Sequence, residues 1–173
     1  ADFISRNVFG LAPVFSFDIP GMMPLNQYGH VILLGVLLGA LGVAYNVCID
    51  KFQKLYQKIR WRVLRILPPF LCTGVLGFVF PKVLGGGHAL AAEVSTGKFA
   101  AGFLCLLFIV KFLFSMVSFG SGAPGGIFLP LLVMGAMAGG VYYGAAESLM
   151  GAPGGLLANF IILGMAGYFS AIV

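Results

Sequence analysis

The stretch at 120–130 reads GSGAPGGIFLP and lies between two apolar runs long enough to cross a membrane. Glycine and proline break or bend helices, so this stretch exposes backbone where a membrane chain usually hides it. We expect a helix to begin near Ile127, with Pro130 in its first turn, where a missing N–H costs little. The first N–H groups of a helix lack internal partners, and the helix dipole adds about half a positive charge there.

Such a helix start can bind an anion without a cationic side chain. Gly125 and Gly126 leave the backbone uncovered, so an anion can approach the amides closely. Partial charges attract the ion and still let it leave, which conduction requires. The alternative is a plain turn between two helices. The shorter echo GAPGG at 151–155 precedes a span without an aromatic-Pro pair and is typical of a connecting loop.

The composition is that of an integral membrane protein. Of the 173 residues, 60% are hydrophobic and 9% charged, against roughly 25% charged residues in soluble domains. Six of the ten basic residues fall within 51–65, at Lys51, Lys54, Lys58, Arg60, Arg62 and Arg65. A basic cluster beside an apolar span marks the cytoplasmic side, so we expect 50–65 in the cytoplasm and no nucleic acid partner.

The apolar segments predict an all-α integral membrane protein with tilted, broken and re-entrant helices. Their unequal lengths and the Gly and Pro breaks between them do not fit a simple bundle, because a bilayer tolerates loose backbone only under protein or beside a water-filled cavity. The expected segments are a helix end and loop at 1–23, a long first helix at 24–60, a second at 61–81, disturbed by Pro68 and Pro69, a short helix at 88–96, a third span at 99–119, the anion-site helix at 126–147 and a last helix at 155–173.

Two glycine patterns predict close helix packing, since small residues let helix backbones approach in a membrane. The first is a stripe on the long helix, formed by Gly35, Gly39 and Gly42. The second comprises overlapping GxxxG patterns on the anion-site helix, formed by Gly135, Gly139, Gly140 and Gly144.

Lys111 is a charged residue inside the apolar third span, and such residues are functional candidates by default. It is a candidate pathway charge that tunes the potential around the anion route. The alternative is a lysine that snorkels or is paired internally. The His and carboxylate residues show no metal spacing, and there is no nucleophile–base pair, so neither an enzyme nor a metal cofactor is predicted. Cys48, Cys72 and Cys105 lack paired spacing and are expected to be small buried hydrophobes.

The stretch 120–130 resembles the GxFxP motif of the chloride channel and chloride/proton exchanger (CLC) family, with Gly126, Phe128 and Pro130 at its fixed places. The preceding SGAPGG is similar to that of bacterial members. Further features follow the family's order: a long helix with a basic end, GGG before a short segment, the cation Lys111 and the run LGMAGYFSA. The resemblance covers essentially the whole chain.

The resemblance implies a part of the CLC inverted-repeat fold, namely most of its second half. It implies that the backbone amides of Ile127 and Phe128 coordinate chloride, with close approach at Gly125 and Gly126. The implied protein is a chloride/proton antiporter, homodimeric at full length, in a bacterial inner membrane. The family's gating glutamate, coordinating serine and tyrosine belong to segments outside this chain, and Ser121 is not that serine because it lies in the other half's motif.

Two alternatives remain open from the sequence. A passive chloride channel on the same scaffold differs from an antiporter through upstream glutamates. A membrane scaffold without a transport role needs neither the open helix start nor the glycines beside it. The chain lacks an initiator Met and stops inside an apolar run at Val173, so we expect a piece of a longer protein.

Overall fold

The computed structural model describes residues 15, 17, 23–123, 125–150 and 155–173, and all regular structure in these residues is helical. The helix end and loop expected at 1–23, and most of the echo at 151–155, lie outside the described residues. The elements are the 3-10 turn η1 (Leu25–Gln27), α2 (Tyr28–Gln57), α3 (Arg62–Val79), the 3-10 turn η2 (Pro81–Val83), α4 (His88–Ser95), α5 (Ala101–Gly120), α6 (Phe128–Met150) and α7 (Leu157–Ile172).

Three stretches of the described residues are long and apolar enough to cross a membrane, namely Leu25–Gln57, Ala101–Gly120 and Phe128–Leu149. Two shorter apolar helices accompany them, Val63–Val79 and Leu157–Ile172. The prediction of an all-α multi-pass membrane protein is confirmed.

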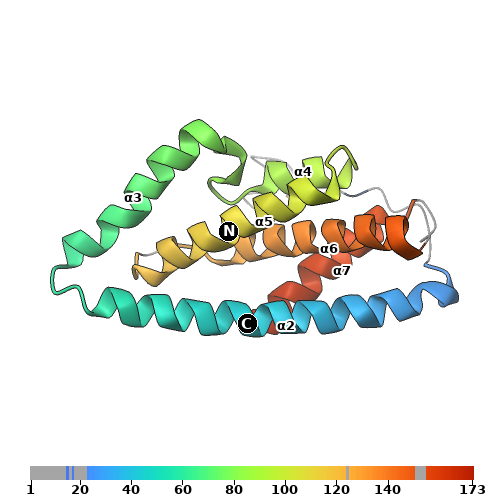
Figure 1. Ribbon diagram of the computed structural model, residues 1–173, viewed down its shortest axis with the longest axis horizontal. Helices are drawn as coiled ribbons and strands as arrows, with labels where there is room; N and C mark the ends of the chain where they lie inside the picture. Colours follow the sequence, from blue (N-terminus) through green and yellow to red (C-terminus); the bar gives the residue numbers. More distant parts are fainter. Residues whose placement is uncertain (1–14, 16, 18–22, 124, 151–154) are drawn as a thin grey trace, which may run out of the picture.

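The helix α2 runs along the whole length of the molecule (Figure 1). Its 30 residues correspond to about 45 Å at 1.5 Å per residue, more than the ~30 Å hydrocarbon core. The excess lies at the C-terminal end, where exposed Lys51, Lys54 and Lys58 follow the apolar part. Arg65 at the start of α3 donates from Nε to the Ile59 carbonyl oxygen at 2.9 Å, which fixes the turn between the two helices.

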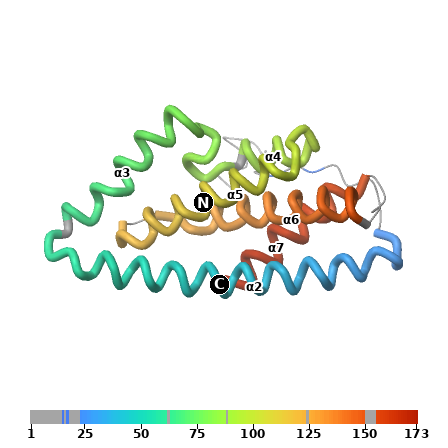
Figure 2. The backbone as a smooth tube through the Cα atoms, viewed as in Figure 1, coloured from blue at the N-terminus to red at the C-terminus, as the bar shows by residue number. Residues whose placement is uncertain are grey.

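The helix α6 forms the centre of the fold. Residues 133–140 are buried without interruption, as expected of a helix that is apolar on all sides. Its neighbours are α7, α5 and α4, and α7 also packs on α2, so it lies between α6 and α2 (Figure 2). Met134 and Met137 on α6 and Phe160 and Ile161 on α7 are completely buried.

The glycines of α6 bring two helix backbones into direct contact. A Cβ at Gly135 would lie 2.5 Å from the Gly164 carbonyl oxygen on α7, and a Cβ at Gly139 would overlap the Phe160 carbonyl oxygen. Gly140 faces α4 and α5 instead, with a Cβ position 3.1 Å from Val94 Cγ1. The close packing predicted from the GxxxG patterns is therefore confirmed.

The glycine stripe predicted on α2 is confirmed at one position, and the other two meet no neighbour in the described chain. A Cβ at Gly42 would lie 2.6 Å from Ala171 Cβ on α7, whereas nothing in the described part of the chain lies within 4 Å of a Cβ at Gly35 or Gly39. The reason is the direction of the buried face. Leu34 and Leu38 define that face, and the helical turn places Gly35 and Gly39 beyond its edge.

The helix α3 departs from the bundle at the end of α2 and packs chiefly against α5 (Figure 1). It is a single helix with Pro68 and Pro69 inside it, although each proline removes one backbone hydrogen bond. Most of its apolar side chains are exposed, including Phe70 and Phe78. After η2 a glycine loop at 84–87 leads into α4, which is followed by α5.

Candidate anion site

The first turn of α6 has open backbone donors. The first backbone hydrogen bond of the helix runs from the Leu131 N–H to the Ile127 carbonyl oxygen, at 3.2 Å. Pro130 has no N–H, and the N–H groups of Ile127, Phe128 and Leu129 make no hydrogen bond among the described residues. Three donors and the positive end of the helix dipole therefore meet at this point.

This helix start lies within the apolar part of the molecule. The Phe128 ring meets Phe169 of α7 edge to face, with centroids 5.1 Å apart. The neighbouring Tyr168 ring meets Tyr45 of α2 at 6.2 Å in the same manner. Tyr45 stands six residues before Lys51, about 9 Å along the helix axis. The open donors therefore lie at the same level as side chains from the apolar part of α2.

The connection from α5 to α6 begins with a tight turn. The helix α5 ends at Gly120, where a Cβ would lie 2.9 Å from Phe52 Cβ, beyond the first lysine of α2. The chain then reverses through Gly122, at φ +75°. The Ser121 hydroxyl donates to the Ser118 carbonyl oxygen at 2.6 Å, so Ser121 serves this turn. From here the chain leads back to the start of α6.

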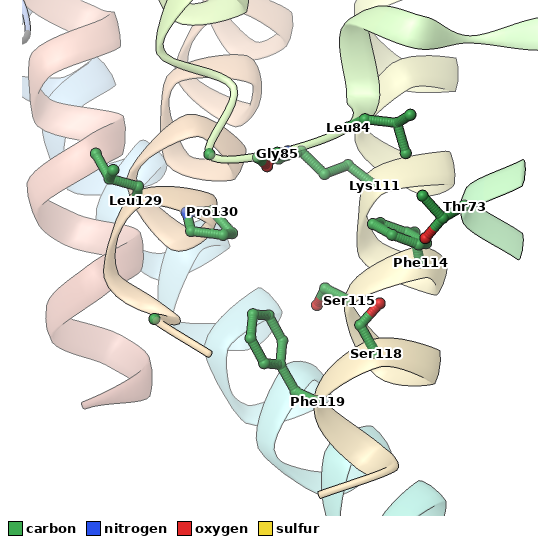
Figure 3. Close-up of a pocket in the computed structure, with 12 residues that line it drawn as sticks. Thr73, Leu84, Gly85, Lys111, Phe114, Ser115, Ser118, Phe119, Leu129 and Pro130 are labelled. Atoms are coloured by element: carbon green, nitrogen blue, oxygen red, sulfur yellow. Dashed lines mark hydrogen bonds between the residues drawn. The ribbon is translucent and has the colours of Figure 1, made fainter. Parts of the chain in front are cut away.

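A cavity of about 520 Å³ opens beside the α6 start, between α5, α6, α3 and the loop before α4. In Figure 3, Lys111 reaches from α5 toward Gly85, and Ser115 and Ser118 follow it along the same helix. Leu129 and Pro130 lie opposite on α6. The twelve lining residues are Thr73, Leu84, Gly85, Gly86, Lys111, Phe114, Ser115, Ser118, Phe119, Gly126, Leu129 and Pro130.

The charge of this cavity is positive. Among the residues that the structure describes, Lys111 is the one charged residue in the lining, and none of them adds an acidic side chain. Lys111 is almost completely buried, with 2% of its surface exposed. Its Nζ donates to the carbonyl oxygens of Val83 at 2.8 Å and Gly85 at 3.3 Å. Among the described residues it forms no ion pair, so carbonyl dipoles alone offset its charge.

Three of the residues predicted from the sequence come together here. Gly126, Pro130 and Lys111 line one cavity, although Lys111 is distant in sequence from the other two. Ile127 and Phe128 form the adjoining helix start but do not line the cavity, and the Phe128 side chain is 54% exposed.

Gly125 also lies outside the lining, and the nearest atom to a Cβ there is Phe119 Cε1 at 3.9 Å. Gly125 is also exposed in the described part of the chain.

The sequence reasoning missed the hydroxyl groups of the cavity, which come from Thr73, Ser115 and Ser118. A signal was present on α5. In the run KFLFSMVS, Lys111 is followed by serines at i+4 and i+7, which is the spacing of one helix face. No comparable signal marks Thr73, because it reaches the cavity from another helix.

A metal site is absent from the part of the chain that the structure describes, since no group of three or more His, Cys, Asp or Glu side chains could hold an ion there. The arrangement suits an anion instead: open amides, hydroxyl donors and one ammonium without a carboxylate in a largely apolar wall.

The sequence is similar to those of known proteins. The profile of the family described as "Voltage gated chloride channel" matches residues 1–173. The H(+)/Cl(-) exchange transporter ClcA of Yersinia pestis bv. Antiqua (strain Angola) is 34% identical over 155 residues, covering 87% of this chain and 32% of that protein. The ClcA of Klebsiella pneumoniae is 34% identical over 156 residues, covering 87% and 33%. That of Salmonella arizonae is 30% identical over 170 residues, covering 95% and 36%. The chain spans about a third of the length of these relatives.

Proposed function

The chain belongs to the voltage-gated chloride channel family, and we propose that the protein containing it moves chloride across a bacterial inner membrane in exchange for protons. The family comprises transport proteins rather than enzymes. The observation that carries the proposal is the start of α6, where three N–H groups without a partner among the described residues lie beside a cavity whose described lining has one lysine and no acidic side chain. The names of the bacterial relatives support exchange with protons.

In this proposal the amides of Ile127 and Phe128 coordinate chloride. Gly125 and Gly126 allow the approach, because no described atom other than Phe119 Cε1 lies within 4 Å of a Cβ at either position. Lys111 is a pathway charge that raises the potential of the cavity. The site has few full charges and several partial charges on its N–H groups, so the ion can bind and still be released.

The other partners follow from the family resemblance. Chloride and protons are the transported ions, the lipid bilayer surrounds the protein, and the full-length protein is a homodimer. Each of these belongs to the proposal for the whole protein, because the chain spans only about a third of the length of the curated relatives.

A passive chloride channel is the second candidate, because the matching family is described as a channel. The two functions share the same anion site and differ in whether protons move against their gradient. They are separated by a flux measurement on the full-length protein.

The test places the full-length protein in chloride-loaded liposomes and follows chloride efflux and external pH together. Exchange predicts chloride efflux with proton movement against a proton gradient, whereas a channel gives efflux alone. No efflux above that of empty liposomes would overturn both transport functions and favour a membrane scaffold.

The site itself is tested by Gly126→Leu. No described atom lies within 4 Å of a Cβ at Gly126, so we expect the substitution to be tolerated by the fold and the added side chain to cover the open amides. We expect chloride efflux to fall at least about tenfold, the equivalent of one lost contact of about 1.4 kcal/mol. Gly102→Leu is the matched control, because Gly102 is equally unobstructed but lies on α5 outside the cavity lining. Normal efflux with Gly126→Leu would refute the assigned site.

A further inference from the structure

The glycine loop at 84–87 lies between the buried ammonium of Lys111 and the start of α6. Two of its glycines, Gly85 at φ +63° and Gly87 at φ +75°, adopt the left-handed backbone conformation. Residues other than glycine rarely adopt this conformation. This path brings the carbonyl oxygens of Val83 and Gly85 to a single Nζ, at 2.8 and 3.3 Å. The loop is therefore bound to α5 by one side chain.

The same loop touches the first two turns of α6. A Cβ at Gly86 would lie 3.3 Å from Leu129 Cδ1, and a Cβ at Gly87 would lie 3.2 Å from Val133 Cγ1. A Cβ at Gly87 would also lie 3.1 Å from Lys111 Nζ. Because the glycines carry no side chains, the loop backbone packs directly on the Leu129 and Val133 side chains of the helix that offers its open amides at Ile127 and Phe128.

The loop is also a wall of the cavity, since Leu84, Gly85 and Gly86 line it together with Lys111 and Gly126. A buried ammonium without a carboxylate needs polar partners. In the described chain these partners are the carbonyls of Val83, directly before the loop, and of Gly85 within it. The dependence is mutual, because Val83 is completely buried and its carbonyl oxygen takes its hydrogen bond from Lys111.

We propose that Lys111 is a positioning residue, whose ammonium holds the loop at 84–87 against the first turns of α6 and thereby sets the shape of the anion cavity. This role goes beyond that of a pathway charge, because it acts through backbone carbonyls. Its effect on transport rests on the proposed function, but its effect on the loop does not.

The loop is tested directly with a thiol at Leu84. The full-length protein carries Leu84→Cys in a background without other cysteines, and labelling by the uncharged reagent N-ethylmaleimide is timed. Loss of the ammonium in Lys111→Met removes charge-assisted hydrogen bonds, so we expect labelling about tenfold faster. Lys111→Arg keeps the charge and the donors, so labelling stays within about twofold of the parent's. Lys98→Met is the control, because Lys98 is exposed and forms no hydrogen bond or ion pair among the described residues.

Transport is measured in parallel on variants that keep Leu84, by chloride efflux from liposomes. Lys111→Met should lose most of its efflux and Lys111→Arg should recover it. Labelling of Lys111→Met at the parental rate would overturn the proposal, and any loss of efflux would then belong to the pathway charge. Faster labelling with normal efflux would show that the loop does not shape the anion route, which also overturns it.

A second variant keeps the ammonium in place and moves the loop. In Gly86→Val the added side chain meets Leu129, which lies 3.3 Å from the Cβ position, while the charge of Lys111 is untouched. We expect faster labelling at Leu84→Cys and reduced efflux. Unchanged values for both would overturn the proposal even where Lys111→Met fails to fold.

Discussion

The helix α6 uses glycine for opposite purposes in its middle and at its start. In the middle, Gly135 and Gly139 let the backbone of α6 touch that of α7, where even a methyl group would meet a carbonyl oxygen. At the start, no described atom lies within 4 Å of a Cβ at Gly126, and that residue lines an open cavity. One residue type thus serves tight packing at one place and exposed backbone at another.

This difference has a physical cause. Between helices in a membrane the hydrophobic effect does not drive association, so close van der Waals contact must do so, and glycine permits it. At the helix start the groups proposed to coordinate the anion are the N–H donors of Ile127 and Phe128, and a missing side chain leaves such donors accessible. Substitutions in the middle should therefore affect folding, and substitutions at the start should affect transport, as Gly126→Leu tests.

The largest expected effect is on stability, at Gly139. A Cβ there overlaps the Phe160 carbonyl oxygen, so Gly139→Ala must separate α6 from α7. We expect a loss of about 3 kcal/mol or more, at the upper end for overpacked cores. The measurement is the melting temperature and the monodisperse fraction of the full-length protein in detergent. Gly102→Ala is the control, and parental melting of Gly139→Ala would contradict the contact.

An intermediate effect on stability is expected at the hydrogen bond between α2 and α5 that lies beside the cavity. The hydroxyls of Tyr45 and Ser115 lie 3.0 Å apart, and Ser115 lines the cavity. Tyr45→Phe should lower stability by about 1 kcal/mol, the usual value of one hydrogen bond. The buried Tyr168 hydroxyl has no hydrogen-bond partner among the described residues, so Tyr168→Phe should be neutral or stabilising. Thermal unfolding of both variants checks the opposite signs, and an equal loss in both would count against this account.

The smallest effect is expected at Gly39 on α2. Nothing in the described chain lies within 4 Å of a Cβ there, so Gly39→Leu should change the stability by no more than about 0.5 kcal/mol. Unfolding of the full-length protein measures it, with the close-packed Gly42→Leu as the contrasting variant. A large loss at Gly39 would mean that another part of the full-length protein covers this face.

Much of the candidate site could be predicted from the sequence because its determinants are local. Glycine and proline near 120–130 interrupt the helices, and the position of Pro130 in a first turn follows from its missing N–H. The GxxxG spacing in α6 likewise follows from the helical period. The stripe on α2 meets no neighbour of the described chain at Gly35 and Gly39, because spacing gives a shared face but not how far along it a neighbouring helix extends.

The sequence by itself determined that this is a multi-pass helical membrane protein and that a basic cluster lies at the end of its long helix α2. It also determined that a helix starts at open glycine backbone near Ile127. Only the tertiary structure decided what stands around that start. Thr73 and the loop at 84–87 reach the cavity from segments about 40 residues or more away from Gly126. Lys111 finds its partners in the carbonyls of Val83 and Gly85. Backbone carbonyls are the same in every residue type, so no pattern of side chains could have identified them.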